Sequence, residues 1–237
     1  MYRTTACAAI GACLATAAAA APVTYTDRAA FETAVAAIAG HTQVDESYEG
    51  PALGTVIPDG GTVGGITHNY ALFGGAAGEL VIADHPTSTG AQSVGFTLDG
   101  GATAAFLGSG DVIDFSFGPS FAFGIDIQMP NDFDVFADEI SVSAAGVTLN
   151  SFESQGLGSG TDAFDEAFFG IIDTASAFTS ASLSFPGFAG VVYSFDNVSI
   201  TAVDDTPPPS DVPLPAAAPL ALLGLGALGL VGRRRRG

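Results

Sequence analysis

The feature that most limits the fold of this chain is a series of short strand patterns from about residue 42 to residue 200. Runs of β-branched and aromatic residues alternate with small or polar ones, and Gly, Asp, Pro or Asn separates the runs. Turn signals recur about every 8–12 residues, which favours an all-β antiparallel β-sandwich of jelly-roll type. The clearest predicted strands are 112–117, 121–127, 140–143, 147–152, 181–185 and 191–200.

One short helix is predicted ahead of the strands. Thr26 is placed to cap a helix over residues 27–39, and Gly40 is placed to end it. The helical period puts three apolar residues on one stripe, which would face the sandwich: Phe31, Val35 and Ile38.

The charges are distributed very unevenly along the chain. There is no lysine, and all 25 acidic residues lie between Asp27 and Asp211, where Arg28 is the one basic residue. Such a surface repels phosphate backbones, so nucleic acid is excluded as a partner. It is typical of a soluble surface in salty water, where ions screen the repulsion over ~10 Å or less.

The N-terminus has the pattern of a signal peptide over residues 1–20. Arg3 precedes an uncharged, alanine-rich run, and small residues at 18–20 predict cleavage between Ala20 and Ala21. Alternatively, Ile10–Cys13 fits a lipobox, in which Cys13 would become a lipidated N-terminus. Both cysteines, Cys7 and Cys13, belong to this segment, so the exported part has no disulfide and no cysteine nucleophile.

The C-terminus has three consecutive parts. Residues 205–211 include three prolines in a row and predict a stiff, extended linker. The apolar run 217–232 is a candidate transmembrane helix, slightly short of the usual ~20 residues. The four arginines that follow would hold that end in the cytoplasm and leave residues 21–211 outside: Arg233, Arg234, Arg235 and Arg236.

The residues between the linker and the apolar run carry a family resemblance. Val212, Pro213, Leu214, Pro215 and Ala216, with the apolar run and the arginines, resemble the VPLPA variant of the PEP-CTERM sorting signals. The resemblance covers about residues 212–236. It implies that an exosortase-type enzyme cleaves near the proline motif and delivers the domain to the cell surface or the extracellular matrix. The predicted domains are therefore 1–20, 24–204, 205–211 and 212–237.

A second resemblance concerns the predicted sandwich, residues 24–204. The helix, Tyr48–Gly50, Gly108–Asp111 and Phe195–Val198 resemble sandwich domains often carried by PEP-CTERM proteins, which are similar in outline to carbohydrate-binding modules. Such modules often hold a structural Ca²⁺ between an acid on the first strand and an Asp on the last. The resemblance therefore implies a tentative Ca²⁺ site at Glu46 or Glu49 with Asp196; no other cofactor is expected.

No catalytic pattern is found in the sequence. There is no Gly-x-Ser-x-Gly elbow, and no histidine pair has the helical spacing of a zinc site. The leading hypothesis is a non-enzymatic surface or matrix protein that contacts polysaccharide. Two alternatives stay open, a calcium-dependent carbohydrate-binding module and a glycan hydrolase that uses two carboxylates.

Overall fold

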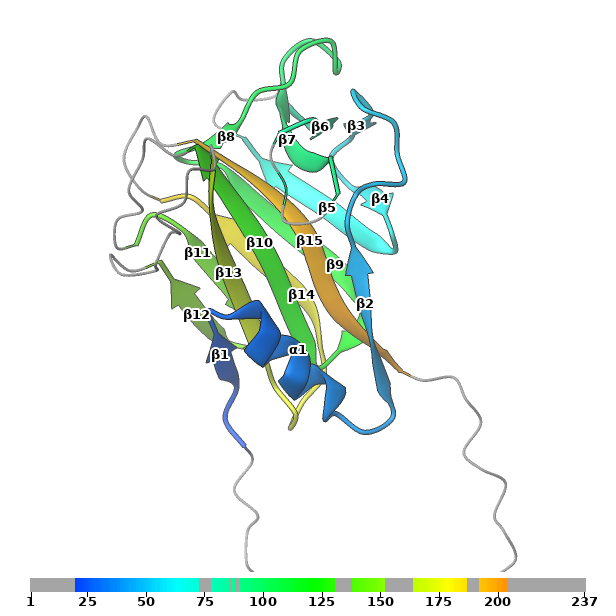
Figure 1. The fold of residues 1–237 in the computed structure, drawn as a ribbon, viewed down its shortest axis with the longest axis vertical. Helices are drawn as coiled ribbons and strands as arrows, with labels where there is room; N and C mark the ends of the chain where they lie inside the picture. Colours follow the sequence, from blue (N-terminus) through cyan, green and yellow to red (C-terminus); the bar gives the residue numbers. More distant parts are fainter. Residues whose placement is uncertain are drawn as a thin grey trace, which may run out of the picture. The chain divides into compact units, whose positions relative to one another are not determined.

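A computed structural model describes residues 20–72, 78–85, 87, 90–130, 138–151, 164–186 and 192–203. The chain divides into two compact units, 1–203 and 204–237, and all described residues belong to the first. That unit is a sandwich of two antiparallel sheets with one helix against it (Figure 1). The predicted all-β sandwich is confirmed. The predicted signal peptide and C-terminal helix lie outside the described residues, apart from Ala20 and Ala21.

Among the described residues, the larger sheet has nine strands. Its central path is β1-β13-β10-β15-β7-β6-β3, and both β2 and β8 also pair with β15. All pairings are antiparallel. The strands are β1 (Val23–Tyr25), β2 (His41–Glu46), β3 (Val56–Ile57), β6 (Glu79–Ala83), β7 (Ser93–Thr97), β8 (Leu107–Gly108), β10 (Ala122–Pro130), β13 (Phe164–Ile172) and β15 (Val192–Val203).

In the smaller sheet the described part of the chain contributes six strands, in the order β12-β11-β14-β9-β5-β4. The strands are β4 (Gly61–Val63), β5 (Ile66–Ala71), β9 (Val112–Ser120), β11 (Ser141–Ala144), β12 (Val147–Asn150) and β14 (Phe178–Ser184). Alternate residues of both sheets point inward and form the main core. Phe115 of β9 and Phe123 of β10 meet there with ring centroids 5.4 Å apart.

The helix α1 (Arg28–Ala36) lies on the outer face of the nine-stranded sheet, in front of β10 and β13 (Figure 1). Phe31 lies against Gly124 and Gly170, which are paired across β10 and β13. A Cβ atom at Gly170 would lie 2.6 Å from the Phe31 ring, and one at Gly124 would lie 2.9 Å from it. The two glycines therefore leave the space that the helix needs to approach the sheet.

The bounds of α1 correct the sequence prediction. The N-cap is Asp27, not Thr26, because the Asp27 carboxylate accepts a hydrogen bond from the Ala30 N–H at 2.7 Å. The helix ends at Ala36, three residues earlier than predicted, and Gly40 at φ +73° then leads into β2. The six predicted strands correspond to β9, β10, β11, β12, β14 and β15, with shifted ends.

Candidate functional site

The outer face of the six-stranded sheet is covered by small polar side chains. In each strand the residues between the core positions point away from the sandwich. On β14, for example, Ala181 and Leu183 are buried, whereas Ser180 and Ser182 are at least partly exposed. The polar residues of this outer face, called the hydroxyl face below, are Thr62, Thr67, Asn69, Asp114, Ser116, Ser141, Ser143, Thr148, Asn150, Ser180, Ser182 and Ser184.

The register of the sheet aligns these side chains in rows across the strands. In the longest row each residue is the Cα partner of the next, and the row crosses five strands: Asn69, Asp114, Ser182, Ser143 and Thr148. Side chains in such a row lie about 4.5–5.5 Å apart at Cβ. The Ser143 and Thr148 hydroxyls share a hydrogen bond of 2.8 Å, and Ser141 donates to Asn150 at 2.9 Å.

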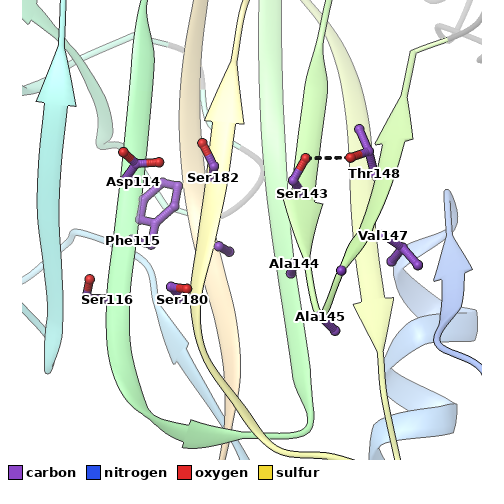
Figure 2. A pocket seen from close by; sticks show the side chains of 12 residues that line it. Asp114, Phe115, Ser116, Ser143, Ala144, Ala145, Val147, Thr148, Ser180 and Ser182 are labelled. Atoms are coloured by element: carbon purple, nitrogen blue, oxygen red, sulfur yellow. Dashed lines mark hydrogen bonds between the residues drawn. The ribbon is translucent and has the colours of Figure 1, made fainter.

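A shallow pocket of about 460 Å³ lies on the part of the hydroxyl face that β9, β14, β11 and β12 form. Figure 2 shows Asp114, Ser182, Ser143 and Thr148 on neighbouring strands around it. Asp114 is the single ionisable group among the described residues that line the pocket. Hydroxyl groups both donate and accept hydrogen bonds, so the pocket suits a neutral ligand that itself carries hydroxyl or amide groups.

On the opposite side of the sandwich, Arg28 joins the helix to the nine-stranded sheet. Its guanidinium forms a two-pronged ion pair with the fully buried Asp126 carboxylate, at 3.0 Å through Nε and 2.7 Å through Nη2. It also donates to the Ser199 hydroxyl at 3.1 Å and to the Asn197 carbonyl at 2.8 Å. The guanidinium carbon lies 4.7 Å above the centre of the Phe168 ring.

The carbonyl that faces Arg28 is presented by a β-bulge in β15. The register against β10 shifts between Gly124 and Asp126, and Asn197 has φ +48°. Asparagine tolerates this left-handed conformation better than most residues. The Asp196 carboxylate accepts a hydrogen bond from the Asn197 N–H at 2.6 Å, and the Asn197 amide donates to Asp126 at 3.2 Å. The Phe195–Val198 sequence therefore has a structural role.

Glu166 of β13 lies next to this ion pair. Desolvation, followed by the negative charge of Asp126 and a hydrogen bond to it, raises the pKa of Glu166 to about 7, although Arg28 acts in the opposite direction. Near neutral pH the Glu166 carboxyl group is therefore partly protonated, and in that form it can donate a hydrogen bond to Asp126.

We expect the Glu166→Gln variant to lose less stability than the parent protein as pH rises from 4.5 to about 7. The folded-state pKa lies above the usual 4.5, so the folded protein binds more protons between pH 4.5 and about 7, and its stability falls as pH rises through this window. Water screens the exposed side chain, which reduces the effect. Urea denaturation across this range measures it, with the exposed Glu32→Gln as control. If the unfolding free energies of Glu166→Gln and the parent changed with pH in parallel, the raised pKa of Glu166 would be contradicted.

A buried tyrosine–histidine pair lies between the two sheets. Both side chains are fully buried, and the Tyr48 hydroxyl and His68 Nε2 are 2.9 Å apart. Burial lowers the pKa of His68 to about 4, and burial with the nearby Glu46 and Asp196 charges raises the pKa of Tyr48 well above its usual value. Both groups are therefore neutral across the physiological range, and the pair contributes to the core.

The structure places the three residues of the tentative Ca²⁺ site in separate local roles. Glu46 accepts the Tyr48 N–H at 2.7 Å, and Glu49 accepts the N–H groups of Ala91 and Gln92 at 2.7 and 2.8 Å. Asp196 supports the bulge described above. Within the described ranges, no group of three or more His, Cys, Asp or Glu side chains is placed to hold a metal ion. The Ca²⁺ site stays a prediction from the resemblance.

The predicted sorting residues lie outside the described part of the chain. These are Val212–Ala216 and Arg233–Arg236, together with the apolar run between them. Ala20 and Ala21, between which cleavage is predicted, are described and exposed ahead of β1. Among the described residues, no helix has the length and apolar character needed to cross a membrane.

The hydroxyl face was not predicted from the sequence, although the sequence contains a signal for it. Patterns such as Ser180-x-Ser182-x-Ser184 and Ser141-x-Ser143 repeat with the period of two that is typical of strands. That signal could have identified a polar outer face. It could not have shown which strands are neighbours, and therefore could not have placed Asp114 beside Ser182.

Comparison with known proteins supports the interpretation of the C-terminus. Residues 211–236 match the family model described as the PEP-CTERM protein-sorting motif. No curated protein and no solved structure matches the chain. The motif implies export, sorting to the cell surface and processing by an enzyme of the exosortase type. The chain therefore carries a PEP-CTERM-like sorting motif at residues 211–236, which follows an antiparallel β-sandwich in the sequence.

Proposed function

We propose that the delivered sandwich is a non-enzymatic surface or extracellular-matrix protein that contacts neutral polysaccharide through the hydroxyl face. The observation that carries this proposal is the pocket of about 460 Å³ lined by serine and threonine from adjacent strands. Neutral polysaccharide offers many hydroxyl groups, each able to donate and accept. Anionic polymers would be repelled, because residues 27–211 contain 25 acidic residues and one arginine.

The geometry of the hydroxyl face favours weak, repeated contacts over one tight site. Phe115 is the one aromatic residue among the described lining residues, and its side chain is buried in the core. Without an exposed ring for a sugar to stack on, binding depends on hydrogen bonds, each worth about 0.5–1.5 kcal/mol net. A long polymer that meets many copies of the protein at a cell surface would gain affinity through multivalency.

The route to the surface is a second part of the proposal. The apolar run 217–232 would hold the precursor in the membrane, with the arginines that follow it in the cytoplasm, until an exosortase-type enzyme cleaves near residues 212–216. The match to the sorting motif supports this order of events.

The proposed contact can be tested with two serines in the middle of the longest row. We expect Ser143→Ala combined with Ser182→Ala to weaken binding of the full-length protein to immobilised neutral glucans about tenfold, because two hydrogen bonds are lost. A co-sedimentation assay measures the loss. The matched control removes two hydroxyl groups from the exposed turn after β13, by Thr174→Ala combined with Ser176→Ala, and we expect no change from it.

Parallel assays separate the alternatives. The proposal predicts the same binding with and without Ca²⁺, and no release of reducing sugar from the glucan. Binding lost on adding EGTA would support the calcium-dependent module instead, and released sugar would support a hydrolase. Absence of saturable binding to any neutral glycan would overturn the polysaccharide contact.

A further inference from the structure

The polar side chains of the hydroxyl face differ in whether they bond to one another. On the outer strands they pair across the sheet: Ser143 with Thr148, Ser141 with Asn150, and Thr62 with Thr67 at 2.9 Å. On the two central strands, β9 and β14, the four polar residues that line the pocket form no hydrogen bond or ion pair with another described residue. These four are Asp114, Ser116, Ser180 and Ser182.

These four side chains, called the central four below, are accessible. Asp114, Ser116 and Ser180 are exposed, and Ser182 is partly exposed. Water therefore satisfies their polar atoms in the free protein, and a ligand that supplies matching groups can take its place. The part of the pocket over β9 and β14 thus offers the open hydrogen-bonding groups, whereas Ser143 and Thr148 already bond to each other.

The strand register sets the central four at the corners of a small rectangle. Asp114 is the Cα partner of Ser182, and Ser116 is the Cα partner of Ser180. Partners lie about 4.5–5.5 Å apart at Cβ, and residues two apart along a strand lie about 7 Å apart. Figure 2 shows the pair of Asp114 and Ser182 above the pair of Ser116 and Ser180. This rectangle is comparable in size to one six-membered sugar ring with its hydroxyl groups.

Asp114 differs from the other three in its charge. It is the one charged residue of the hydroxyl face in the described part of the chain, and the ion pairs found there are formed by Arg28, which lies against the other sheet. Several other aspartates accept local backbone hydrogen bonds, among them Asp27, Asp59 and Asp173. No described residue makes such a contact with Asp114, so its carboxylate is available to a ligand.

The chemistry of a carboxylate indicates which ligand feature it would select. It accepts hydrogen bonds and donates none, and its two oxygens lie side by side, so they fit two hydroxyl groups on neighbouring carbons of a sugar ring. Hydrogen bonds to an ionised acceptor are about twice as strong as those between neutral groups. We propose that Asp114 anchors one ring of a neutral glycan by accepting hydrogen bonds from two adjacent hydroxyl groups, while the three serines contact the rest of that ring. The anchor is part of the proposed polysaccharide contact, depends on it, and selects glycans with a free pair of adjacent hydroxyl groups.

Two neutral glucans of the same composition test this selectivity. A (1→4)-linked glucose unit keeps free hydroxyl groups on the adjacent carbons 2 and 3. In a (1→3)-linked unit the oxygen on carbon 3 belongs to the linkage, so no two adjacent carbons carry free hydroxyl groups. We expect the full-length protein to bind insoluble β-(1→4)-linked glucan about tenfold more tightly than insoluble β-(1→3)-linked glucan. Dissociation constants from co-sedimentation isotherms measure the difference.

Variants of Asp114 should remove this preference. Asp114→Asn leaves one oxygen and no charge, so its affinity for the (1→4)-linked glucan should fall about tenfold, to that for the (1→3)-linked glucan, which should itself change little. Asp114→Ser, which repeats the residue type of its partner Ser182, should behave in the same way. The matched control is Glu32→Gln, which removes one exposed charge from the helix on the other sheet and should leave both affinities unchanged.

The possible results separate the anchor from the wider contact. Equal affinity of the parent for the two glucans would overturn the anchor and leave the polysaccharide contact standing, and so would a preference that both Asp114 variants keep. A preference that disappears on adding EGTA would show that a cation joins Asp114 to the sugar, which would also overturn direct acceptance. If the parent bound neither glucan in a saturable way, the contact and the anchor would both be wrong.

Discussion

Replacing Arg28 with methionine should destabilise the protein by about 3–5 kcal/mol, because it leaves the buried Asp126 carboxylate without its cation. Methionine keeps much of the packing against Phe168, so the loss is mainly electrostatic. The same arginine also bonds to Ser199 and to the bulge carbonyl of Asn197, so the contacts between α1 and β15 weaken together. Equilibrium urea denaturation measures the change.

Two further variants identify the source of that loss. Arg28 also lies 3.5 Å from Glu32, but this pair is near the surface, and Glu32→Gln should cost less than about 1 kcal/mol. Adding Asp126→Asn to Arg28→Met removes the orphaned charge, so the double variant should be more stable than Arg28→Met alone. A cost below about 1 kcal/mol for Arg28→Met, or an additive double variant, would contradict the role of the ion pair.

The second large effect is expected at acid pH through His68. Its folded-state pKa of about 4 lies below the usual 6.5, so between these values the unfolded chain binds more protons than the folded protein. Stability should therefore fall as pH drops from 6.5 to about 4. A difference of about 2.5 pKa units corresponds to a loss of about 3 kcal/mol from this residue. Protonated His68 could no longer accept a hydrogen bond from Tyr48 at Nε2.

The His68 contribution can be separated from that of other groups. Glu166 acts in the opposite direction over an overlapping window, so the comparison is best made in the Glu166→Gln background. There, His68→Gln keeps a possible acceptor for Tyr48 and removes the titration. The difference in unfolding free energy between the two proteins should change by about 3 kcal/mol across the window. If the unfolding free energies of the two proteins changed with pH in parallel, His68 would be protonated equally in the folded and unfolded states, and the prediction would be wrong.

Local sequence patterns predicted six of the fifteen strands that the described residues form: β9, β10, β11, β12, β14 and β15. In residues 121–127, large apolar residues alternate with small or polar ones. This alternation predicted which side chains of β10 point inward, and Phe123, Ile125 and Ile127 lie in the core. Strands such as β3 and β8, with two residues each, were missed because they are too short to show a period. Two longer strands, β5 and β13, were also not predicted. The helix was predicted with the wrong cap, since Thr26 and Asp27 are both good capping residues and the choice depends on the backbone conformation.

What the sequence determined by itself is local or compositional: the strand alternation, the helix, the acidic surface and the sorting motif at residues 211–236. Strand order and register were decided only in the tertiary structure, because they depend on which inward faces pack together. They bring Arg28 to Asp126, 98 residues away, and they place Gln128 between Glu166 and Ser194. The hydroxyl face consists of side chains aligned across strands, so it could not be read from the order of residues along one strand.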